Sequence, residues 1–437
     1  MSSDIGFNKD ADVGAGTRDS GVSSRWMMAF CAGAFLFFLG LLAHVFGEGG
    51  GRVGVLRGLF VPVASAIQLT TLVLLFRPKR VGGTLDLLRR NGILTVALAL
   101  IMMSTIWSLD PAITLRRAFA LLGTTALGLL IYIEVGRANL LRFFAVNLAL
   151  FVAGSVIVAL AIPELGTHPS GVFAGNWRGL VDDKNGVAPI AVVFLLVWLG
   201  LRKRGWMATW NILWLAFGIL LLFRAGSATG FASFVFGVGV FGMLAVYRRR
   251  RLLRPLVVVA AATVCLFAAL NYSAIFQQSL QMLDRDATLT GRTAMWQALA
   301  PMINDRFWLG SGYGAFWYDP SSYTGFIGST RWMADMNYAH NAYIDMLLNV
   351  GIIGLIIQLI FLFIVCGRLF AGAARNDNVA MTMLVVLLTL LFVGIVDTGA
   401  LFRANAGLWV MVVAFACYAS HCRARSPEGR GPLEESR

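Results

Sequence analysis

His340 and Asn341 form a pair of side chains that could do chemistry, because they stand where a polar segment meets an apolar one. They belong to the stretch AHNAYIDMLLNVGIIGL, in which Asp345 follows about one helical turn later. An imidazole has an ordinary pKa of about 6.5, so a small shift makes it a usable general base at neutral pH. The pattern therefore predicts a histidine at the mouth of an apolar helix, between water and hydrocarbon.

A structural role is the alternative for His340, as a helix cap or a hydrogen-bonded core residue. The neighbours Asn341 and Asp345 favour the catalytic interpretation. Gly351 and Gly354 follow in the same run, and their small side chains predict that another helix packs closely there.

A second group of residues could bind an anion. The segment TGRTAMWQALAPMIND predicts a helix with Thr290 as its N-cap, Arg292 in its first turn and its end near Asp305. Arg292 and Trp296 are four residues apart and share a helix face. A guanidinium beside the free N–H groups of a helix N-terminus suits a phosphate or pyrophosphate. On spacing alone, a solvated arginine explains Arg292 equally well.

Other cations are candidates of the same kind. Arg116 and Arg117 lie in WSLDPAITLRRA, and Arg224 lies in FRAGSATG. Each could bind an anion, face an internal cavity or reach outward to the membrane interface. Lys184 and Asn185 begin an apolar run, where they could be a charged cap or a ligand contact.

Two further motifs favour structural roles. GSGYGAF, with glycines at 310, 312 and 314, lacks the GK[ST] of a phosphate loop, so a tight turn explains it as well. Asp397 and Arg403 bracket another turn, and we expect them to form a salt bridge.

The composition shows what must position these residues. Of the 437 residues 58% are hydrophobic and only 13% are charged, with a mean hydropathy of +0.75. Such a chain cannot bury its apolar surface in one soluble core, which indicates a membrane protein with many helices. The net charge of +14 then reflects basic residues that set the orientation of the chain in the membrane, rather than nucleic-acid binding. The five cysteines form no CxxC pair, so neither a disulfide framework nor a zinc site is indicated.

Apolar runs long enough to cross hydrocarbon recur along the chain. We expect an all-α protein with about twelve transmembrane helices. They centre on residues 26–46, 55–76, 92–108, 114–134, 142–162, 186–201, 206–223, 228–247, 255–271, 342–366, 379–396 and 405–421.

Basic residues assign the two sides of the membrane. With the N-terminus inside, the inner segments hold 24 of the 36 lysines and arginines, as the positive-inside rule requires. Both termini are then cytoplasmic, with tails over residues 1–25 and 422–437. Helices one to nine occupy 26–271, helices ten to twelve occupy 342–421, and a large outer loop spans 272–341. Because no soluble catalytic domain is present, we expect any chemistry at the outer interface, where this loop also concentrates aromatic rings suited to sugars or to the bilayer surface.

These motifs together resemble the O-antigen ligase and polysaccharide polymerase superfamily. TGRTAMW, the glycine turn and AHNAYIDMLLNVGIIGL carry the resemblance, while WSLDPAITLRRA and DDKNGVAPIA are similar to its exopolysaccharide-polymerase, ExoQ-like branch. The resemblance covers roughly residues 100–360. It implies a bacterial inner-membrane glycosyltransferase, active at the periplasmic face, whose donor is an undecaprenyl-pyrophosphate-linked glycan. No metal, cofactor or nucleotide sugar is implied.

The resemblance also implies roles for individual residues. The essential histidine of the family falls on His340 and its outer-loop arginine on Arg292. Its second arginine, usually in an SxSR pattern, is matched less well by Arg224, which precedes the serine. Pyrophosphate contacts are then expected from Arg292, Arg224, Arg116 and Arg117, with support from Asn341, Asp345, Trp296, Lys184 and Asn185.

A polymerase and a ligase differ in the acceptor that they use. Polymerisation of exopolysaccharide or O-antigen repeat units needs a lipid-linked repeat unit as acceptor, whereas an O-antigen ligase transfers glycan to lipid A core. DDKNGVAPIA favours the polymerase, with other assembly and export proteins as possible partners. A lipid-linked saccharide flippase is the alternative of another class, although the chain shows no internal repeat of the kind common in transporters.

Overall fold

The chain folds into packed α-helices. The computed structural model describes residues 21–43, 58–171, 173–201, 206–259, 263, 287–318, 338–398 and 401–422. Within these ranges the only pairing of extended backbone is an isolated bridge between Thr167 and Trp177. The predicted all-α class is therefore confirmed for the described part of the chain.

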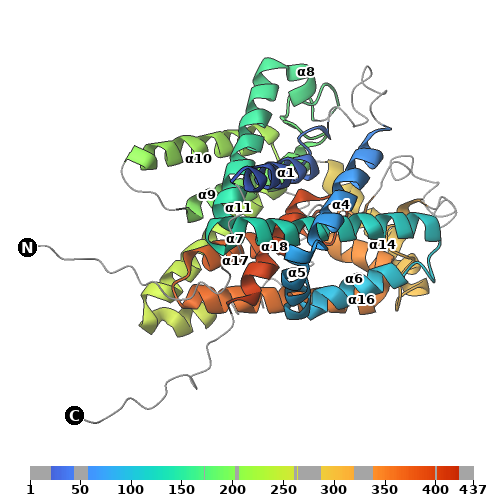
Figure 1. Cartoon of the computed structure of the whole chain (residues 1–437). Coiled ribbons are helices and arrows are strands. Elements are labelled where there is room, and N and C mark those ends of the chain that lie inside the picture. Colours follow the sequence, from blue (N-terminus) through green and yellow to red (C-terminus); the bar gives the residue numbers. More distant parts are fainter. Residues whose placement is uncertain are drawn as a thin grey trace, which may run out of the picture.

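Figure 1 shows the arrangement of the helices. The α-helices are α1 (Gly21–Leu39), α4 (Phe60–Leu75), α5 (Pro78–Arg90), α6 (Gly92–Met103), α7 (Pro111–Ala161), α8 (Pro163–Gly166), α9 (Lys184–Gly200), α10 (Trp206–Ala225), α11 (Ala228–Arg249), α14 (Ala287–Asp305), α16 (Ala342–Ala374), α17 (Asn378–Val393) and α18 (Gly407–Ser420), with short 3₁₀ turns η1 (Arg251–Leu253) and η2 (Phe316–Tyr318).

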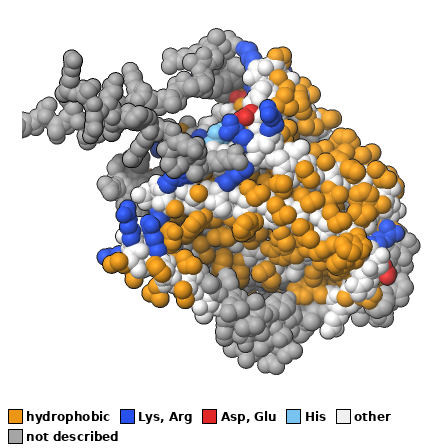
Figure 2. Space-filling view, turned by 90° about the horizontal axis from the view of Figure 1, so that it is seen from below, with side chains coloured by type: hydrophobic (Ala, Val, Ile, Leu, Met, Phe, Trp, Pro, Cys, Tyr) orange, Lys and Arg blue, Asp and Glu red, His pale blue; other side chains and the backbone are white. Residues whose placement is uncertain are grey.

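Several helices have the length and composition of membrane spans. Three of them (α7, α11 and α16) are long and apolar enough to cross a bilayer, and α4 with α5 would make a fourth if that pair, bent by 96°, is one span. Six shorter apolar helices accompany them. Large side chains such as Phe363, which is 79% exposed, cover the outside, and Figure 2 shows a broad hydrophobic face with lysines and arginines gathered at its margin. This surface suits lipid rather than water, so the chain is a multi-pass membrane protein.

The helices follow the predicted apolar runs with two differences. The runs 114–134 and 142–162 form two helices of α7 that meet at a kink in place of the predicted loop, because Gly136 has the non-helical angles φ 70° and ψ 163°. The basic stretch predicted as a loop after the second run forms the amphipathic helix α5. The run 255–271 falls largely outside the described residues, and the total of twelve spans stays a prediction.

Helix α18 lies at the centre of the bundle (Figure 1) and packs against α7, α16 and α1. Its residues are all buried, and Trp409 donates from Nε1 to the Thr125 hydroxyl of α7 at 3.0 Å. The turn that leads into α18 is consequently held near the middle of the molecule.

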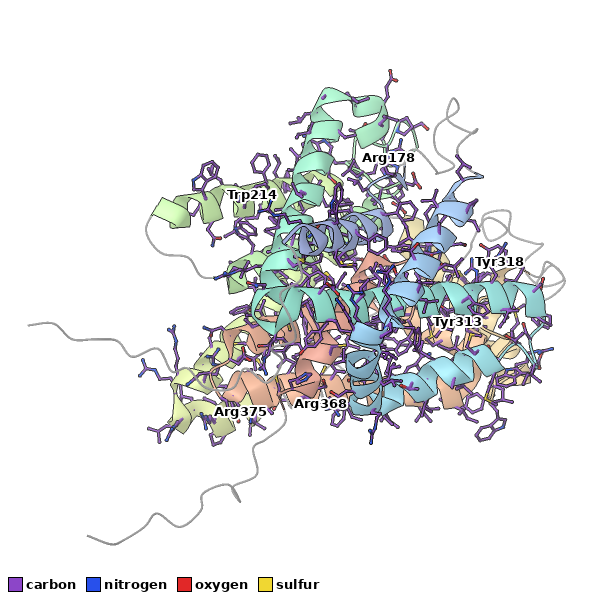
Figure 3. The ribbon with its side chains drawn as sticks, in the orientation of Figure 1. Arg178, Trp214, Tyr313, Tyr318, Arg368 and Arg375 are labelled. Carbon is purple, nitrogen blue, oxygen red and sulfur yellow. The ribbon has the colours of Figure 1, made fainter. Side chains whose placement is uncertain are left out.

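Segments predicted to be cytoplasmic contact one another. Arg137 donates to the Asp377 carboxylate at 3.2 Å, and Arg368 donates to the carbonyl of Arg90 at 3.1 Å. Arg368 lies well away from Tyr313 and Tyr318 in Figure 3. The predicted inner segments thus share one region of the fold, apart from the region that carries the predicted outer residues.

Candidate functional site

A break in α16 organises the site. Gly351 has φ 64° and ψ −170°, so the helix that begins at Ala342 is interrupted after Val350 and then continues to Ala374. The break frees backbone groups that lipid could not satisfy. The segment after α14 satisfies them: Ser311 donates its N–H to the Leu348 carbonyl at 2.8 Å, and Gly312 donates to Asn349 at 3.0 Å.

This contact corrects the expectation for Gly351. A Cβ there would lie 2.3 Å from the Trp308 carbonyl oxygen, so the close partner is a loop backbone and not another helix. At Gly354 a Cβ would lie 2.3 Å from Val350 Cγ2 of α16 itself, whereas Leu100 of α6 lies 3.5 Å away, an ordinary van der Waals distance. Packing of another helix at Gly354 therefore stays a prediction.

The glycine turn predicted at residues 310–314 is confirmed. Gly310, Gly312 and Gly314 all have positive φ, and the turn docks on the segment before α7. Leu109 donates its N–H to the Ser311 carbonyl at 2.9 Å, and Tyr313 donates its N–H to the Ser104 hydroxyl at 3.1 Å. WSLDPAITLRRA and GSGYGAF, far apart in the sequence, are thus neighbours in space.

His340 is buried at the mouth of α16, with a relative exposure of 9%. Its backbone is left-handed, with φ 49°, which directs the chain into the helix. The Tyr338 ring lies 4.3 Å from the imidazole, centroid to centroid. The histidine therefore sits in a fixed aromatic setting, as a positioned proton acceptor would.

Asn341 and Asp345 hold the backbone around His340 in place. We call residues 339–341 the His340 corner. Asn341 caps α16, accepting at Oδ1 from the N–H groups of Tyr343 (2.9 Å) and Ile344 (3.0 Å), and donates from Nδ2 to the Ile395 carbonyl at 2.8 Å. Asp345 reaches back to accept from the N–H of Ala339 at 3.0 Å. Both residues brace the backbone on either side of His340.

Helix α14 packs against the same corner. Trp296 donates from Nε1 to the carbonyl of Ala339, the residue before His340, at 2.8 Å. A small apolar cluster joins the two helices, with Met295, Leu299, Phe316, Trp317, Ala339 and Leu348. Arg292 lies one helical turn before Trp296, so its backbone is placed beside the His340 corner.

The start of α14 differs from the prediction. The helix begins at Ala287, so Thr290 lies inside it rather than capping it, and Arg292 falls in the second turn. No breaker stops the helix between Ala287 and Thr290. The end at Asp305 is as predicted, whereas the side chain of Arg292 lies outside the described residues.

We expect Trp296→Phe to lower activity by about ten-fold and stability by about 1–3 kcal/mol, because it leaves the buried Ala339 carbonyl without this donor. Trp308→Phe is the matched control, since Trp308 is 67% exposed. Thermal unfolding and glycan transfer by the purified variants measure both effects. Equal behaviour of the two variants would show that the Trp296 bond does not position the site.

A cavity of about 700 Å³ adjoins this corner. Its polar lining includes Arg116, Arg117, Arg403, Asp345 and Asn349. Aromatic and apolar residues complete the lining, among them Tyr313, Trp317, Tyr318 and Tyr338, and from α4 Phe60, Val61, Leu69 and Leu72. The cavity thus combines cations, rings suited to sugar faces and an apolar side.

Arg117 is fixed at the cavity by the glycine turn. Its guanidinium lies 4.3 Å from the centre of the Tyr318 ring and donates to the Tyr318 hydroxyl. A Cβ at Gly314 would come within 2.2 Å of Arg117 Cδ, so only glycine leaves room for this side chain. Figure 3 shows Tyr313 and Tyr318 in this part of the molecule.

Arg224, Lys184 and Asn185 are not among the residues lining this cavity. The exposed Arg224 stacks on Trp177 at 5.1 Å. Lys184 is buried with its ammonium 3.7 Å from the Phe173 ring centre. Asp183, rather than Lys184, caps α9 by accepting from the Asn185 N–H at 3.1 Å. Asn185 lines a separate small cavity that also includes Asp397.

His168 belongs to the same group, since its Nε2 accepts from the Lys184 N–H at 3.2 Å. Burial holds the pKa of His168 below its ordinary value, although nearby Asp183 acts in the opposite direction. The neutral ring is therefore the form that packs here.

Sequence reasoning missed two residues of the cavity. Arg403 was expected to pair with Asp397, but in the described residues it makes no ion pair and stacks 5.1 Å from the Tyr338 ring centre. Asn349 accepts at Oδ1 from the Gly314 N–H at 2.8 Å. A polar residue two positions before a glycine in an apolar run was the available signal for Asn349.

Comparisons with known proteins bear on this geometry. A family model described as O-Antigen ligase matches residues 212–359, about a third of the chain. The exopolysaccharide production protein ExoQ of Rhizobium meliloti (strain 1021) is 27% identical over 267 residues, which cover 57% of this chain and 59% of ExoQ. The chain is similar to the O-antigen ligase and polysaccharide polymerase superfamily. The resemblance predicted from the sequence, including its ExoQ-like character, is confirmed.

The O-antigen ligase match contains Arg224, Arg292 and His340 together with the break at Gly351. It begins after Arg116 and Arg117 and ends before Arg403. The three arginines that line the cavity therefore lie outside the matched region.

Proposed function

We propose that the chain is a glycosyltransferase that polymerises exopolysaccharide or O-antigen repeat units from undecaprenyl-pyrophosphate-linked donors at the periplasmic face of the bacterial inner membrane. The observation that carries the proposal is the cavity next to His340, whose lining includes Tyr338 and Asp345, three arginines and apolar residues of α4. A lipid-linked glycan has matching parts: an anionic pyrophosphate, a sugar and a hydrocarbon chain.

The chemistry follows from the positions of the charges. A hydroxyl of the acceptor sugar attacks the anomeric carbon of the donor, the bond from that carbon to the pyrophosphate oxygen breaks, and undecaprenyl pyrophosphate leaves. His340 takes the hydroxyl proton. Arg116 and Arg117 stabilise the charge that develops on the leaving group, with Arg292 acting from α14.

The remaining residues have supporting roles in this proposal. Asn341, Asp345 and Trp296 hold the His340 corner through the bonds described above. Arg224, Lys184 and Asn185 are not among the residues that line this cavity, so the proposal gives them no pyrophosphate contact there. The aromatic stacking of Arg224 and Lys184 suits a contact with sugar or with the membrane surface. The mechanism uses no metal or cofactor.

Reconstitution tests the proposal. Purified protein in liposomes, given labelled lipid-linked repeat units, should produce longer lipid-linked glycans. Movement of the label across the bilayer without growth of the glycan would instead establish a flippase.

A ligase is the second candidate, and the family description O-Antigen ligase favours it. Its acceptor would be lipid A core. A deletion strain separates the two enzymes: loss of secreted polymer supports the polymerase, whereas intact polymer that fails to join lipid A core supports the ligase.

A further inference from the structure

The turn that carries Arg403 is held in a strained conformation. We call residues 401–406, which precede α18, the strap. Phe402 and Asn405 in it have φ of 48° and 61°, a left-handed region that costs Phe402 about 1–3 kcal/mol and that Asn adopts more readily. A conformation of this kind persists only where its surroundings hold it.

Two side chains from other elements hold the strap. The buried Tyr313 hydroxyl donates to the Phe402 carbonyl at 2.7 Å and accepts from the Ala404 N–H at 3.1 Å. Burial raises the pKa of Tyr313 to about 12, so the hydroxyl keeps the proton that it donates. From α4, Gln68 donates to the Asn405 amide oxygen at 2.6 Å. Arg403 is therefore presented from a fixed backbone, flanked on both sides by anchored residues.

The side chain of Arg403 is directed to the cavity. It lines the cavity together with Arg116 and Arg117, and its guanidinium stacks on Tyr338, the ring next to His340. Arg117 lies likewise over the Tyr318 ring, and one of its terminal nitrogens donates to the Tyr318 hydroxyl. Stacking uses the flat face of a guanidinium, so the N–H groups of Arg403 and the remaining ones of Arg117 can bind phosphate oxygens in the plane.

The charged residues that line the large cavity favour an anionic ligand. Three arginines and one carboxylate, Asp345, line the same space. Asp397, the expected partner of Arg403, lines the separate small cavity with Asn185. The positive charge of Arg403 is thus left for a ligand of the large cavity.

We propose that Arg403 and Arg117 bind one phosphate or pyrophosphate group together, with Arg403 contributing from the strap. The inference rests on the proposed function, because it assigns a further residue to the leaving-group end of the same site. In this proposal the strained strap holds the Arg403 guanidinium next to the His340 corner.

Binding of geranyl pyrophosphate and of inorganic pyrophosphate to the purified full-length protein in detergent tests the proposal. Calorimetric titration should show about ten- to a hundred-fold weaker binding of geranyl pyrophosphate to Arg403→Gln, as expected for loss of a charge-assisted contact. Arg403→Lys should lose less. Arg306→Gln is the control, since exposed Arg306 follows α14 and does not line the cavity; it should stay within about two-fold of the wild type. Inorganic pyrophosphate should bind more weakly than geranyl pyrophosphate if the apolar α4 residues of the lining contact the geranyl chain.

A double-variant cycle shows whether the two arginines share one anion. The affinity lost in Arg117→Gln/Arg403→Gln should differ from the product of the two single losses by more than about three-fold, because groups that bind one ligand are coupled. Weaker binding in Arg117→Gln with unchanged binding in Arg403→Gln would overturn this inference and leave the proposed function standing. If the wild type binds neither probe, or if Arg117→Gln binds both normally, the leaving-group site of the proposed function fails as well. Thermal unfolding of each variant confirms that a loss of binding is not a loss of fold.

Discussion

Replacing His340 with Asn should lower the rate of glycan transfer by about two to four orders of magnitude, the usual contribution of a positioned general base. Asn is chosen because His340 has a left-handed backbone with φ 49°, which Asn adopts more readily than most residues. Ala would remove the imidazole but would also add backbone strain. Transfer by the purified variant, measured with labelled lipid-linked repeat units, gives the rate.

Thermal unfolding supplies the control for this experiment. If His340→Asn unfolds near the wild-type temperature and transfers glycan at close to the wild-type rate, the histidine has a structural role and the proposed mechanism is wrong. Arg292→Gln is the companion variant, for which we also expect a severe loss of polymer. Normal polymer length in both variants would refute the assignment of this corner as the catalytic centre.

The parts of the fold that the sequence predicted depend on local signals. Runs of apolar residues become helices, and three glycines within five residues become a turn with positive φ, as observed at Gly310, Gly312 and Gly314. The end of α14 at Asp305 agrees with the polar pair Asn304 and Asp305, although Pro301 lies inside the helix and does not end it. These features need no knowledge of what packs against them.

The parts that the sequence missed depend on partners distant in the chain. The run after His340 is apolar throughout, and the break at Gly351 is stable only because residues 307–312 satisfy the freed backbone groups. At Gly136 the two helices predicted over 114–134 and 142–162 are separated by a kink alone, where a loop was expected. A helix break inside an apolar run leaves no hydropathy signal.

The partners of charged residues were also not predictable from their positions in the sequence. Asp397 and Arg403 are close in sequence and opposite in charge, so a salt bridge was the simplest expectation. In the fold they line different cavities, and the strap that carries Arg403 is held by Tyr313 and Gln68 from far away in the chain. The aromatic rings of the outer loop were noticed from the sequence, but their stacking on Arg117 and Arg403 required the tertiary structure.

Gly351→Ala should destabilise the protein by about 3 kcal/mol or more. A residue with a Cβ is strained at φ 64° and ψ −170°, and that Cβ would lie 2.3–2.5 Å from backbone atoms of Trp308 and Leu309. Backbone cannot move aside as a flexible side chain can. Gly310 approaches α16 in the same manner, with its added Cβ 2.5 Å from the Asn349 carbonyl carbon, so Gly310→Ala should act similarly.

Gly367→Ala is the matched control in the same helix. Gly367 lies inside the continuous part of α16, and an added Cβ there would meet no atom within 4 Å. Ala favours a helix over Gly by up to about 1 kcal/mol, so this variant should unfold at or above the wild-type temperature in detergent. A Gly351→Ala protein as stable as Gly367→Ala would contradict the break. A loss confined to Gly351 and Gly310 would mean that the loop carrying Ser311 and Gly312 is joined to α16 backbone to backbone, and that the cavity wall formed by the glycine turn depends on this junction.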